Sequence, residues 1–446
     1  MPRDNSISRR SLLQQAGLLP SLAAAANAAE VNVNTQSAPS DLKITDMRAC
    51  TVAANYDYPI IRIDTNQGVY GLGEVRDAGV KGIALILKAH ILGRNPLEIE
   101  SILANLRQFA GQGRMGGGYS AVDMALHDIA GKVYGVPAWR LIGARKRDRI
   151  RIYCDTTGHK DPKIYGTRML QRKQMGFTFF KMDLYTSMVE DRPGAVNENG
   201  AATEKGLKYL CEYIAAVRDA IGWDAPLAAD HFGRLSVNDA IRYARAFEPY
   251  QLAWAEDLVP WKNWRGLKAI ADASTTPVLT GEDVFGLEGG FLDMIDNQAV
   301  DIIQPDAETS GGLRETKIIA DYADMHGIPT VLHFAGSPVG CMASVHAAAT
   351  LRNFLCMENH AVDMPWWSDL VIGLPKPIVQ KGYIEVPDKP GLGVELNEAV
   401  IKEHLRYPGY FEPTPTFDDF IVSGYRRVGP WPHYDEDGNY VNKVTY

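Results

Sequence analysis

The feature that most constrains the fold is a succession of short apolar runs after Arg151, one about every 25 residues, each ending in a charged or ionisable residue. Amphipathic helical stretches separate the runs, and this alternation predicts βαβ units and a parallel sheet. Because the carboxyl ends of barrel strands meet at one rim, which carries the chemistry, the ends of these runs form the candidate site. The runs lie at residues 179–181, 227–230, 254–256, 278–282, 302–306, 330–333 and 355–358.

The length of 446 residues fits one large barrel plus a smaller domain. Before the barrel pattern, residues 60–65 and 68–74 read as two strands joined at Asn66-Gln67, and residues 121–141 have helical spacing. We therefore expect an α/β protein. Its predicted parts are an α+β capping domain at 44–150, the barrel at 151–382, and a return to the capping domain plus a C-terminal tail at 383–446.

The N-terminus has the composition of a targeting segment. Ser8-Arg9-Arg10-Ser11-Leu12-Leu13 opens an Ala-rich apolar stretch that ends near Ala26-Asn27-Ala28. A basic start, a short apolar region and an A-x-A-like end are typical of a signal peptide, and the paired arginines resemble a twin-arginine signal. We expect a signal peptide at 1–28, a linker at 29–43, and export to the periplasm without stable membrane anchoring. The alternative is a chance arginine pair on a disordered tail.

Charge and cysteine usage exclude other classes of protein. The net charge is −8 and no basic stripe occurs, which argues against nucleic acid as a partner. The five cysteines are widely spaced, with no zinc-binding or disulfide pattern, and are expected to be small buried side chains.

Three carboxylates follow the apolar runs at one period. Asp230, Glu256 and Glu282 are separated by 26 residues each (256−230 and 282−256), the length of one strand-helix unit. Side chains at this period reach the same rim, where three anions repel one another unless a cation lies between them. Oxygen ligands suit Mg²⁺. Taken singly, each carboxylate is more often a helix cap or a surface ion pair.

The next two runs end in Asp306 and His333. A carboxylate beside an imidazole fixes its tautomer and raises its basicity, which predicts a general base. Lys181 ends an earlier run, and alternation puts Asp183 on the same side. This lysine can act as a base with a depressed pKa or can hold developing negative charge; the bland alternative is an ion pair with Asp183 or Asp230.

Two further residues are candidates at the same rim. Glu358 ends the last run and can hydrogen-bond a substrate carboxylate if it is protonated; the alternative is a surface or capping acid. His231 follows Asp230 directly and is a possible additional acid, although successive strand residues point in different directions.

The order of these residues along successive strands resembles the mandelate racemase subgroup of the enolase superfamily, and residues 125–144 and 388–396 are similar to family segments. The resemblance implies a modified (β/α)₇β TIM barrel under an α+β capping domain, and a homo-oligomer. It implies that Asp230, Glu256 and Glu282 bind Mg²⁺. It also implies that His333 is the base, oriented by Asp306, and that Glu358 contacts the substrate carboxylate.

One departure from the family pattern bears on the reaction. The family has Lys-x-Lys on the second strand, and racemases use the second lysine as a base; here that position is Asp183. A single base predicts α-proton abstraction followed by loss of a β-hydroxyl, the reaction of a sugar-acid dehydratase. A racemase, epimerase or cycloisomerase that uses Lys181 as its second base is the alternative. A non-catalytic exported carboxylate-binding protein would need no Asp306–His333 pair. The polar insertion at 186–205 is a candidate lid or specificity loop.

Overall fold

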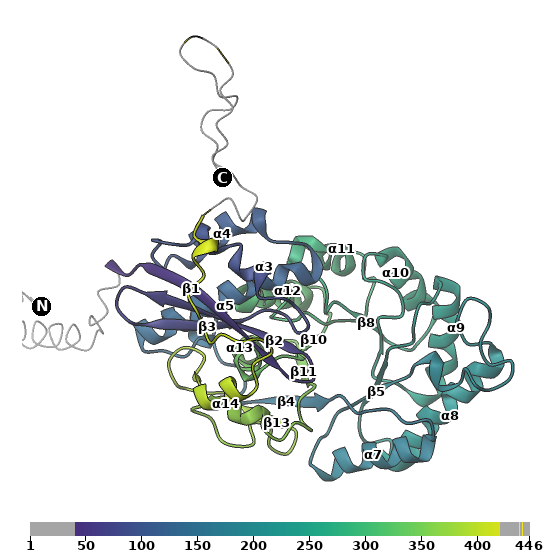
Figure 1. Cartoon of the computed structure of the whole chain (residues 1–446). Helices are drawn as coiled ribbons and strands as arrows, with labels where there is room; N and C mark the ends of the chain where they lie inside the picture. The colour runs from purple at the N-terminus through teal and green to yellow at the C-terminus, as the bar shows by residue number, and fades with distance from the viewer. Residues whose placement is uncertain (1–40, 420–436, 438, 440–446) are drawn as a thin grey trace, which may run out of the picture.

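The computed structural model describes residues 41–419, 437 and 439, so the expected signal peptide, most of the linker and most of the tail lie outside the described residues. Eight parallel strands form the barrel sheet in the order β4-β11-β10-β9-β8-β7-β6-β5, and the two end strands contact each other (Figure 1). The strands are β4 (Arg149–Cys154), β5 (Phe180–Asp183), β6 (Leu227–Asp230), β7 (Ala255–Glu256), β8 (Val278–Thr280), β9 (Ile302–Ile303), β10 (Thr330–Leu332) and β11 (Phe354–Asn359).

A helix follows each of the first seven barrel strands, which confirms the predicted (β/α)₇β arrangement. Asp161, Thr203, Ser236, Asn263 and Ser337 each cap a helix N-terminus with a side-chain oxygen. None of the described helices combines the length and apolarity needed to cross a membrane. The seven helices are α7 (Pro162–Gln174), α8 (Glu204–Ile221), α9 (Val237–Phe247), α10 (Trp264–Ala273), α11 (Phe291–Asp296), α12 (Gly312–Met325) and α13 (Pro338–Thr350).

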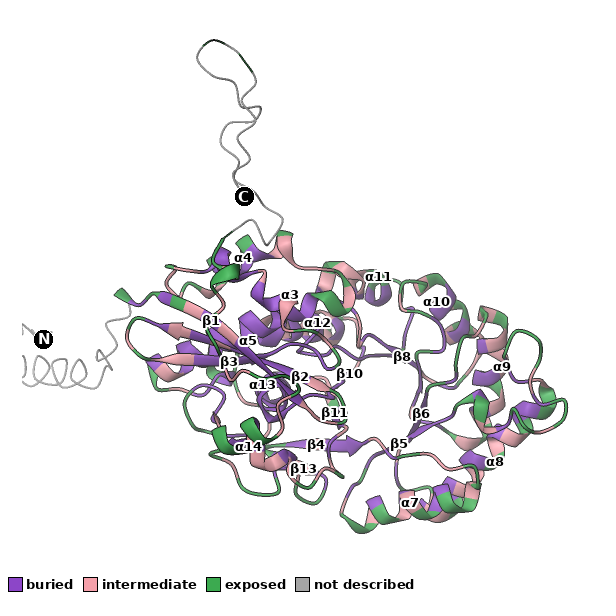
Figure 2. Cartoon of the chain, viewed as in Figure 1, coloured by how far each residue is buried: buried purple, intermediate pink, exposed green. Residues whose placement is uncertain are grey.

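An apolar layer fills the barrel directly below the rim, and most residues of the strands that carry it are buried (Figure 2). Residues two positions apart on a strand share a side, so each member of this layer points the same way as the rim residue that follows it. Phe179, Ala228, Trp254, Val331 and Cys356 stand two positions before Lys181, Asp230, Glu256, His333 and Glu358. The strand pattern therefore directs the ionisable side chains into the barrel mouth. The apolar layer lies directly beneath them.

The capping domain is an antiparallel sheet of β1 (Ile44–Ala53), β2 (Asp57–Thr65) and β3 (Tyr70–Glu74), with α5 (Gly117–Tyr134) packed against it. Gly71 and Gly73 allow the closest approach, because a Cβ atom at either would collide with the α5 backbone at Ala125 or Ala121. The short helices α3 (Gly82–Leu85), α4 (Ile99–Leu106) and α6 (Trp139–Ile142) complete the domain.

The structure corrects the predicted boundary at residue 383. β13 (Tyr383–Glu385) does not return to the capping domain but pairs antiparallel with the first residues of β4, from Arg149 to Arg151. Residues 149–151 of β4 lie before the part of the strand that contacts β5. Their backbone groups on that edge therefore hydrogen-bond to β13 instead. The return begins later, where the Leu392 N–H donates to Asp128 of α5 at 2.8 Å and Leu405 bridges Val52 of β1.

The remaining C-terminal elements also belong to the return. β12 (Val371–Ile372) pairs with β14 (Glu395–Leu396), and α14 (Glu398–Glu403) follows. Glu395 accepts hydrogen bonds from the Tyr70 hydroxyl at 2.6 Å and pairs with Lys132 at 2.8 Å, both in the capping domain. The capping domain is therefore built from segments on both sides of the barrel sequence.

The polar insertion after β5 packs against the outer helices. Arg192 pairs with Glu212 of α8 at 3.0 Å, and the Ala202 N–H donates to the hydroxyl of Tyr243 in α9 at 2.8 Å. Val196 and Ala202 form a bridge that folds the segment back on itself. These contacts favour a packed structural segment over a lid.

Candidate active site

The predicted rim residues of four strands converge on Lys181. Its Nζ lies 2.7 Å from Glu358 Oε1, 2.9 Å from Asp230 Oδ2 and 3.6 Å from Glu256 Oε1. All four side chains are buried. Burial alone would lower the pKa of Lys181, but the three carboxylates raise it well above its usual range. This direction favours the charged form of Lys181 and its predicted role of holding negative charge.

His333 and Asp306 form the predicted dyad. Nδ1 of His333 lies 2.6 Å from Asp306 Oδ2, and both side chains are buried. The carboxylate fixes the proton on Nδ1, so that Nε2 is the acceptor in the neutral ring. Nε2 faces the rim, 3.4 Å from Glu282 and 3.8 Å from Glu358. Burial lowers the pKa of His333 and Glu282 raises it, and with Asp306 the net shift is upward. The geometry suits a general base aimed at the barrel mouth.

Glu358 is a carboxylate rather than the protonated acid that the sequence allowed for. Burial raises its pKa, but Lys181, His360 and His333 together hold that pKa well below its usual range. Three neighbouring nitrogen groups thus keep the side chain ionised. This direction favours the carboxylate form of Glu358, and its predicted contact with a substrate carboxylate stays a prediction.

Asp183 and His231 lie together at the outer edge of the rim. The Tyr185 hydroxyl donates to Asp183 Oδ2 at 3.1 Å, and the His231 ring stacks on Tyr185 with 5.2 Å between ring centroids. Nε2 of His231 lies 3.8 Å from Asp230 and 3.9 Å from Asp183. Burial and Asp155 raise the pKa of Asp183 to about 6. His231 is half-exposed, so it can meet a substrate at the entrance.

The donor chemistry of the three predicted metal ligands suits a hard cation, although Lys181 lies between Asp230 and Glu256, and Glu282 contacts Arg76. Trp254 holds one oxygen of Glu256 at 2.9 Å, whereas the other oxygen, Oε1, is buried and has no hydrogen-bond partner. Burial, followed by Asp230, raises the pKa of Glu256 well above its usual range, and Glu282 adds to this repulsion. An orphaned buried oxygen among mutually repelling carboxylates is what a bound divalent ion would satisfy, and an all-oxygen donor set suits Mg²⁺.

Arg76 is a central residue that the sequence did not reveal. It extends from the loop after β3 of the capping domain and is 1% exposed. Its guanidinium donates to Asp306 Oδ2 at 3.1 Å, to Glu282 Oε1 at 3.1 Å and to Thr309 at 3.0 Å, and it pairs with Asp77 at 2.5 Å. The signal in the sequence was a charged residue just after a strand. How the cap is oriented on the barrel cannot be read from that signal.

His360 and Asp155 were also missed. Nε2 of His360 lies 3.1 Å from Glu358 Oε1, and Nδ1 lies 3.7 Å from Asp155 Oδ2. Burial lowers the pKa of His360, but Glu358 and Asp155 raise it to about 9. The available signals were the position of His360 two residues after Glu358 and that of Asp155 directly after β4.

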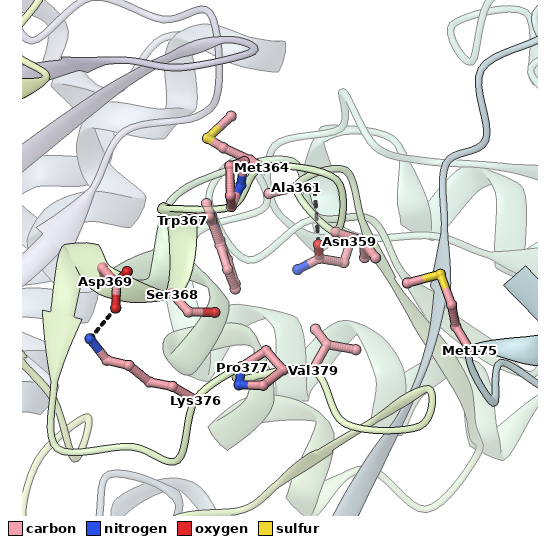
Figure 3. Close-up of a pocket in the computed structure, with 12 residues that line it drawn as sticks. Met175, Asn359, Ala361, Met364, Trp367, Ser368, Asp369, Lys376, Pro377 and Val379 are labelled. Atoms are coloured by element: carbon pink, nitrogen blue, oxygen red, sulfur yellow. Dashed lines mark hydrogen bonds and ion pairs between the residues drawn. The ribbon is translucent and has the colours of Figure 1, made fainter.

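A separate cavity of about 390 Å³ lies beside β11 but does not belong to this site (Figure 3). Asn359, Trp367 and Pro377 line it. Asn359 follows Glu358 on the strand, and successive strand residues point to opposite sides. The cavity therefore opens away from the rim where the ionisable residues meet.

Comparisons with known proteins agree with this geometry. Residues 26–143 match the model of the mandelate racemase / muconate lactonizing enzyme N-terminal domain, and residues 166–400 match that of the enolase C-terminal domain-like family. The chain is 35% identical over 383 residues to a D-xylonate dehydratase of Haloferax volcanii, covering 83% of this chain and 91% of that protein. It is 28% identical over 396 residues to a D-mannonate dehydratase of Caulobacter vibrioides, covering 81% and 95%.

Solved structures give the same picture. A mandelate racemase/muconate lactonizing enzyme-like protein from Rubrobacter xylanophilus superposes with a TM-score of 0.76 at 32% identity, covering 83% of this chain and 99% of that one. An enolase from Pantoea ananatis with bound D-gluconate and Mg superposes with a TM-score of 0.72 at 28% identity, covering 82% and 96%. Both halves of the fold and the chemistry of the rim agree, and the chain therefore belongs to the mandelate racemase / muconate lactonizing enzyme family of the enolase superfamily.

Proposed function

We propose that the protein is a Mg²⁺-dependent dehydratase that converts a sugar acid, an aldonate or aldarate, into a 2-keto-3-deoxy acid. The observation that carries the proposal is a single carboxylate–imidazole base, Asp306–His333, opposite a fixed Lys181 cation. Relatives named as D-xylonate, D-galactonate and D-mannonate dehydratases support it. Asp183 stands where racemases of the family carry a second lysine base, which disfavours a racemase.

The first half of the reaction is removal of the proton next to the substrate carboxylate. That proton is weakly acidic. Asp230, Glu256 and Glu282 would hold Mg²⁺, which would supply Lewis-acid stabilisation of the negative charge. His333 accepts the proton at Nε2 while Asp306 retains the Nδ1 proton and stabilises the imidazolium. Lys181 is already in place as a cation near the developing charge, so little reorganisation is required.

The second half is loss of the β-hydroxyl. The electron pair left on Cα forms a carbon–carbon double bond as the Cβ–O bond breaks. The departing hydroxyl takes a proton from His333 or from His231 at the rim and leaves as water. The resulting enol then tautomerises to the 2-keto-3-deoxy acid.

The test is a screen of the purified protein with Mg²⁺ against sugar acids, including D-xylonate, D-galactonate and D-mannonate, with 2-keto acid formation as the readout. We expect product from at least one acid and a loss of at least ~10³-fold in His333→Asn, the upper range for one acid–base group. Exchange of the α-proton with deuterated solvent, dependent on His333 but without keto product, would instead favour an isomerase. Silence in both assays would contradict the proposal.

We also propose that the protein is exported and acts as a homo-oligomer. The Arg9-Arg10 pair before an apolar stretch supports export, and the family resemblance supports oligomers. Mass spectrometry of the protein from the periplasmic fraction is expected to find a new N-terminus near Ala28. Light scattering during gel filtration measures the assembly. An intact Met1 in the cytoplasmic fraction alone would contradict export.

A further inference from the structure

Three side chains at the rim form a cluster beside the Asp230, Glu256 and Glu282 set, and Nε2 of one of them, His333, lies 3.4 Å from Glu282. His333, Glu358 and His360 each place one ligand atom within 4.8 Å of the others. Nε2 of His360 lies 3.1 Å from Glu358 Oε1, and Nε2 of His333 lies 3.8 Å from Glu358 Oε2. Glu358 Oε1 and His360 Nε2 are both buried and make no hydrogen bond of proper geometry. The cluster therefore brings ligand atoms of three side chains together at one point, where Glu358 Oε1 already pairs with Lys181 at 2.7 Å.

The far side of each imidazole faces a carboxylate, at hydrogen-bond distance for His333 and farther away for His360. Metal-binding histidines typically donate the nitrogen that faces away from the metal to a carboxylate, which fixes the ring and strengthens the ligand. Nδ1 of His333 lies 2.6 Å from Asp306, and Nδ1 of His360 lies 3.7 Å from Asp155. Nε2 of His360 thereby faces Glu358, and Nε2 of His333 faces both Glu358 and Glu282.

We propose that His333, His360 and Glu358 form a second metal site, one that takes Zn²⁺ or a similar borderline divalent ion. Two imidazole nitrogens and one carboxylate oxygen are a common zinc donor set with an open fourth position, whereas the all-oxygen set suits Mg²⁺. Lys181, 2.7 Å from Glu358 Oε1, limits the carboxylate to one oxygen for the ion. The two sites therefore differ in the metal they prefer.

Zinc at this site blocks the reaction. His333 Nε2 would give its lone pair to the metal and could no longer accept the α-proton. This inhibition rests on the proposed function, but binding of the ion does not. Because the ligands differ, saturating Mg²⁺ does not displace the inhibitory zinc.

Calorimetric titration of Zn²⁺ into the full-length protein in excess Mg²⁺ tests the site. We expect one Zn²⁺ per chain, with affinity reduced at least ~100-fold in His360→Asn and about 10- to 100-fold in Asp155→Asn, the usual cost of losing a supporting carboxylate. His231→Asn, a rim histidine outside the cluster, is the matched control and keeps the wild-type affinity. Circular dichroism confirms that each variant is folded.

Two results would overturn the proposal. Zinc that excess Mg²⁺ competes away is bound at the oxygen ligands instead. Zinc whose affinity falls in His231→Asn but not in His360→Asn is bound beside Asp183 and Asp230. In the activity assay, Zn²⁺ should inhibit at saturating Mg²⁺. Each protein's rate is expressed relative to its own rate without zinc, and His360→Asn should need at least ~100-fold more Zn²⁺ than the wild type for half-inhibition. If no sugar acid gives product, the calorimetry still decides the site.

Discussion

At the scale of single residues, one side chain from the capping domain completes the catalytic rim. Arg76 shares an oxygen of Asp306 with His333 and also holds Glu282, a predicted metal ligand. Arg76 is buried together with these partners. Its removal would therefore leave the carboxylates of Asp306 and Glu282 without this counter-ion in the protein interior. Breaking a buried pair in this way is far more costly than losing an exposed one.

We therefore predict that Arg76→Gln lowers the free energy of unfolding by about 3–5 kcal/mol and abolishes most activity. Arg114→Gln is the matched control, because Arg114 lies 3.3 Å from the same Glu282 oxygen but is 47% exposed. Its loss should cost at most about 1 kcal/mol. Urea unfolding of both variants measures the difference. Equal effects of the two substitutions would mean that the buried network around Asp306 is not what makes Arg76 important.

The residues that the sequence predicted and those that it missed differ in a physical way. Asp230, Glu256 and His333 are ordered by the period of the barrel, and a regular repeat fixes which rim they reach. Arg76 reaches the rim because the capping domain packs on the barrel. His360 reaches it because of the conformation of the loop after β11. Such tertiary contacts leave no periodic trace in the chain, so the convergence of ligand atoms around Glu358 could not be predicted from the sequence.

At the scale of elements, β3 and α5 depend on glycine for their close packing. We predict that Gly73→Ala lowers the free energy of unfolding by about 1–3 kcal/mol, because the new methyl group would overlap the α5 backbone at Ala121. Gly82→Ala is the control, since a Cβ atom there meets nothing within 4 Å, and it should change stability by less than about 1 kcal/mol. Thermal unfolding distinguishes the two, and a harmless Gly73→Ala would show that α5 can shift freely.

The existence of strands was easier to predict than their partners. The segment that begins at Tyr383 is a strand, as its sequence indicates, but it pairs with Arg149–Arg151 of the barrel. An alternating pattern reports that a segment is half-buried and extended. It does not report which open edge the segment will join, because that depends on where neighbouring strands begin and end.

At the scale of the whole molecule, the junction between cap and barrel contains a pH-sensitive contact. The backbone N–H of Trp139, in α6 of the cap, donates to Nδ1 of His346 in α13 at 3.3 Å. Burial lowers the pKa of His346 to about 4, so the folded protein keeps this ring neutral. The unfolded chain binds a proton near pH 6.5, and stability therefore falls as the pH drops from about 6.5 towards 4.

We predict that His346 accounts for roughly 2 kcal/mol of lost stability between pH 7 and pH 5, at about 1.4 kcal/mol per pH unit once the unfolded histidine is protonated. In His346→Gln, which still offers an acceptor to Trp139, the loss over the same range should be smaller by that amount. Urea midpoints of both proteins at the two pH values provide the measurement. Parallel decreases would assign the acid sensitivity to other groups.

The bond between Arg76 and the Asp306–His333 dyad also limits how this protein can diverge. Its cap is not an interchangeable module, because exchanging the cap for that of a relative would also exchange the counter-ion of the base. A recombinant chain that joined this barrel to a foreign cap would be active only if the incoming loop after its third strand carried an arginine at the position of Arg76. The catalytic base of the barrel and the arginine of the cap therefore function as one unit.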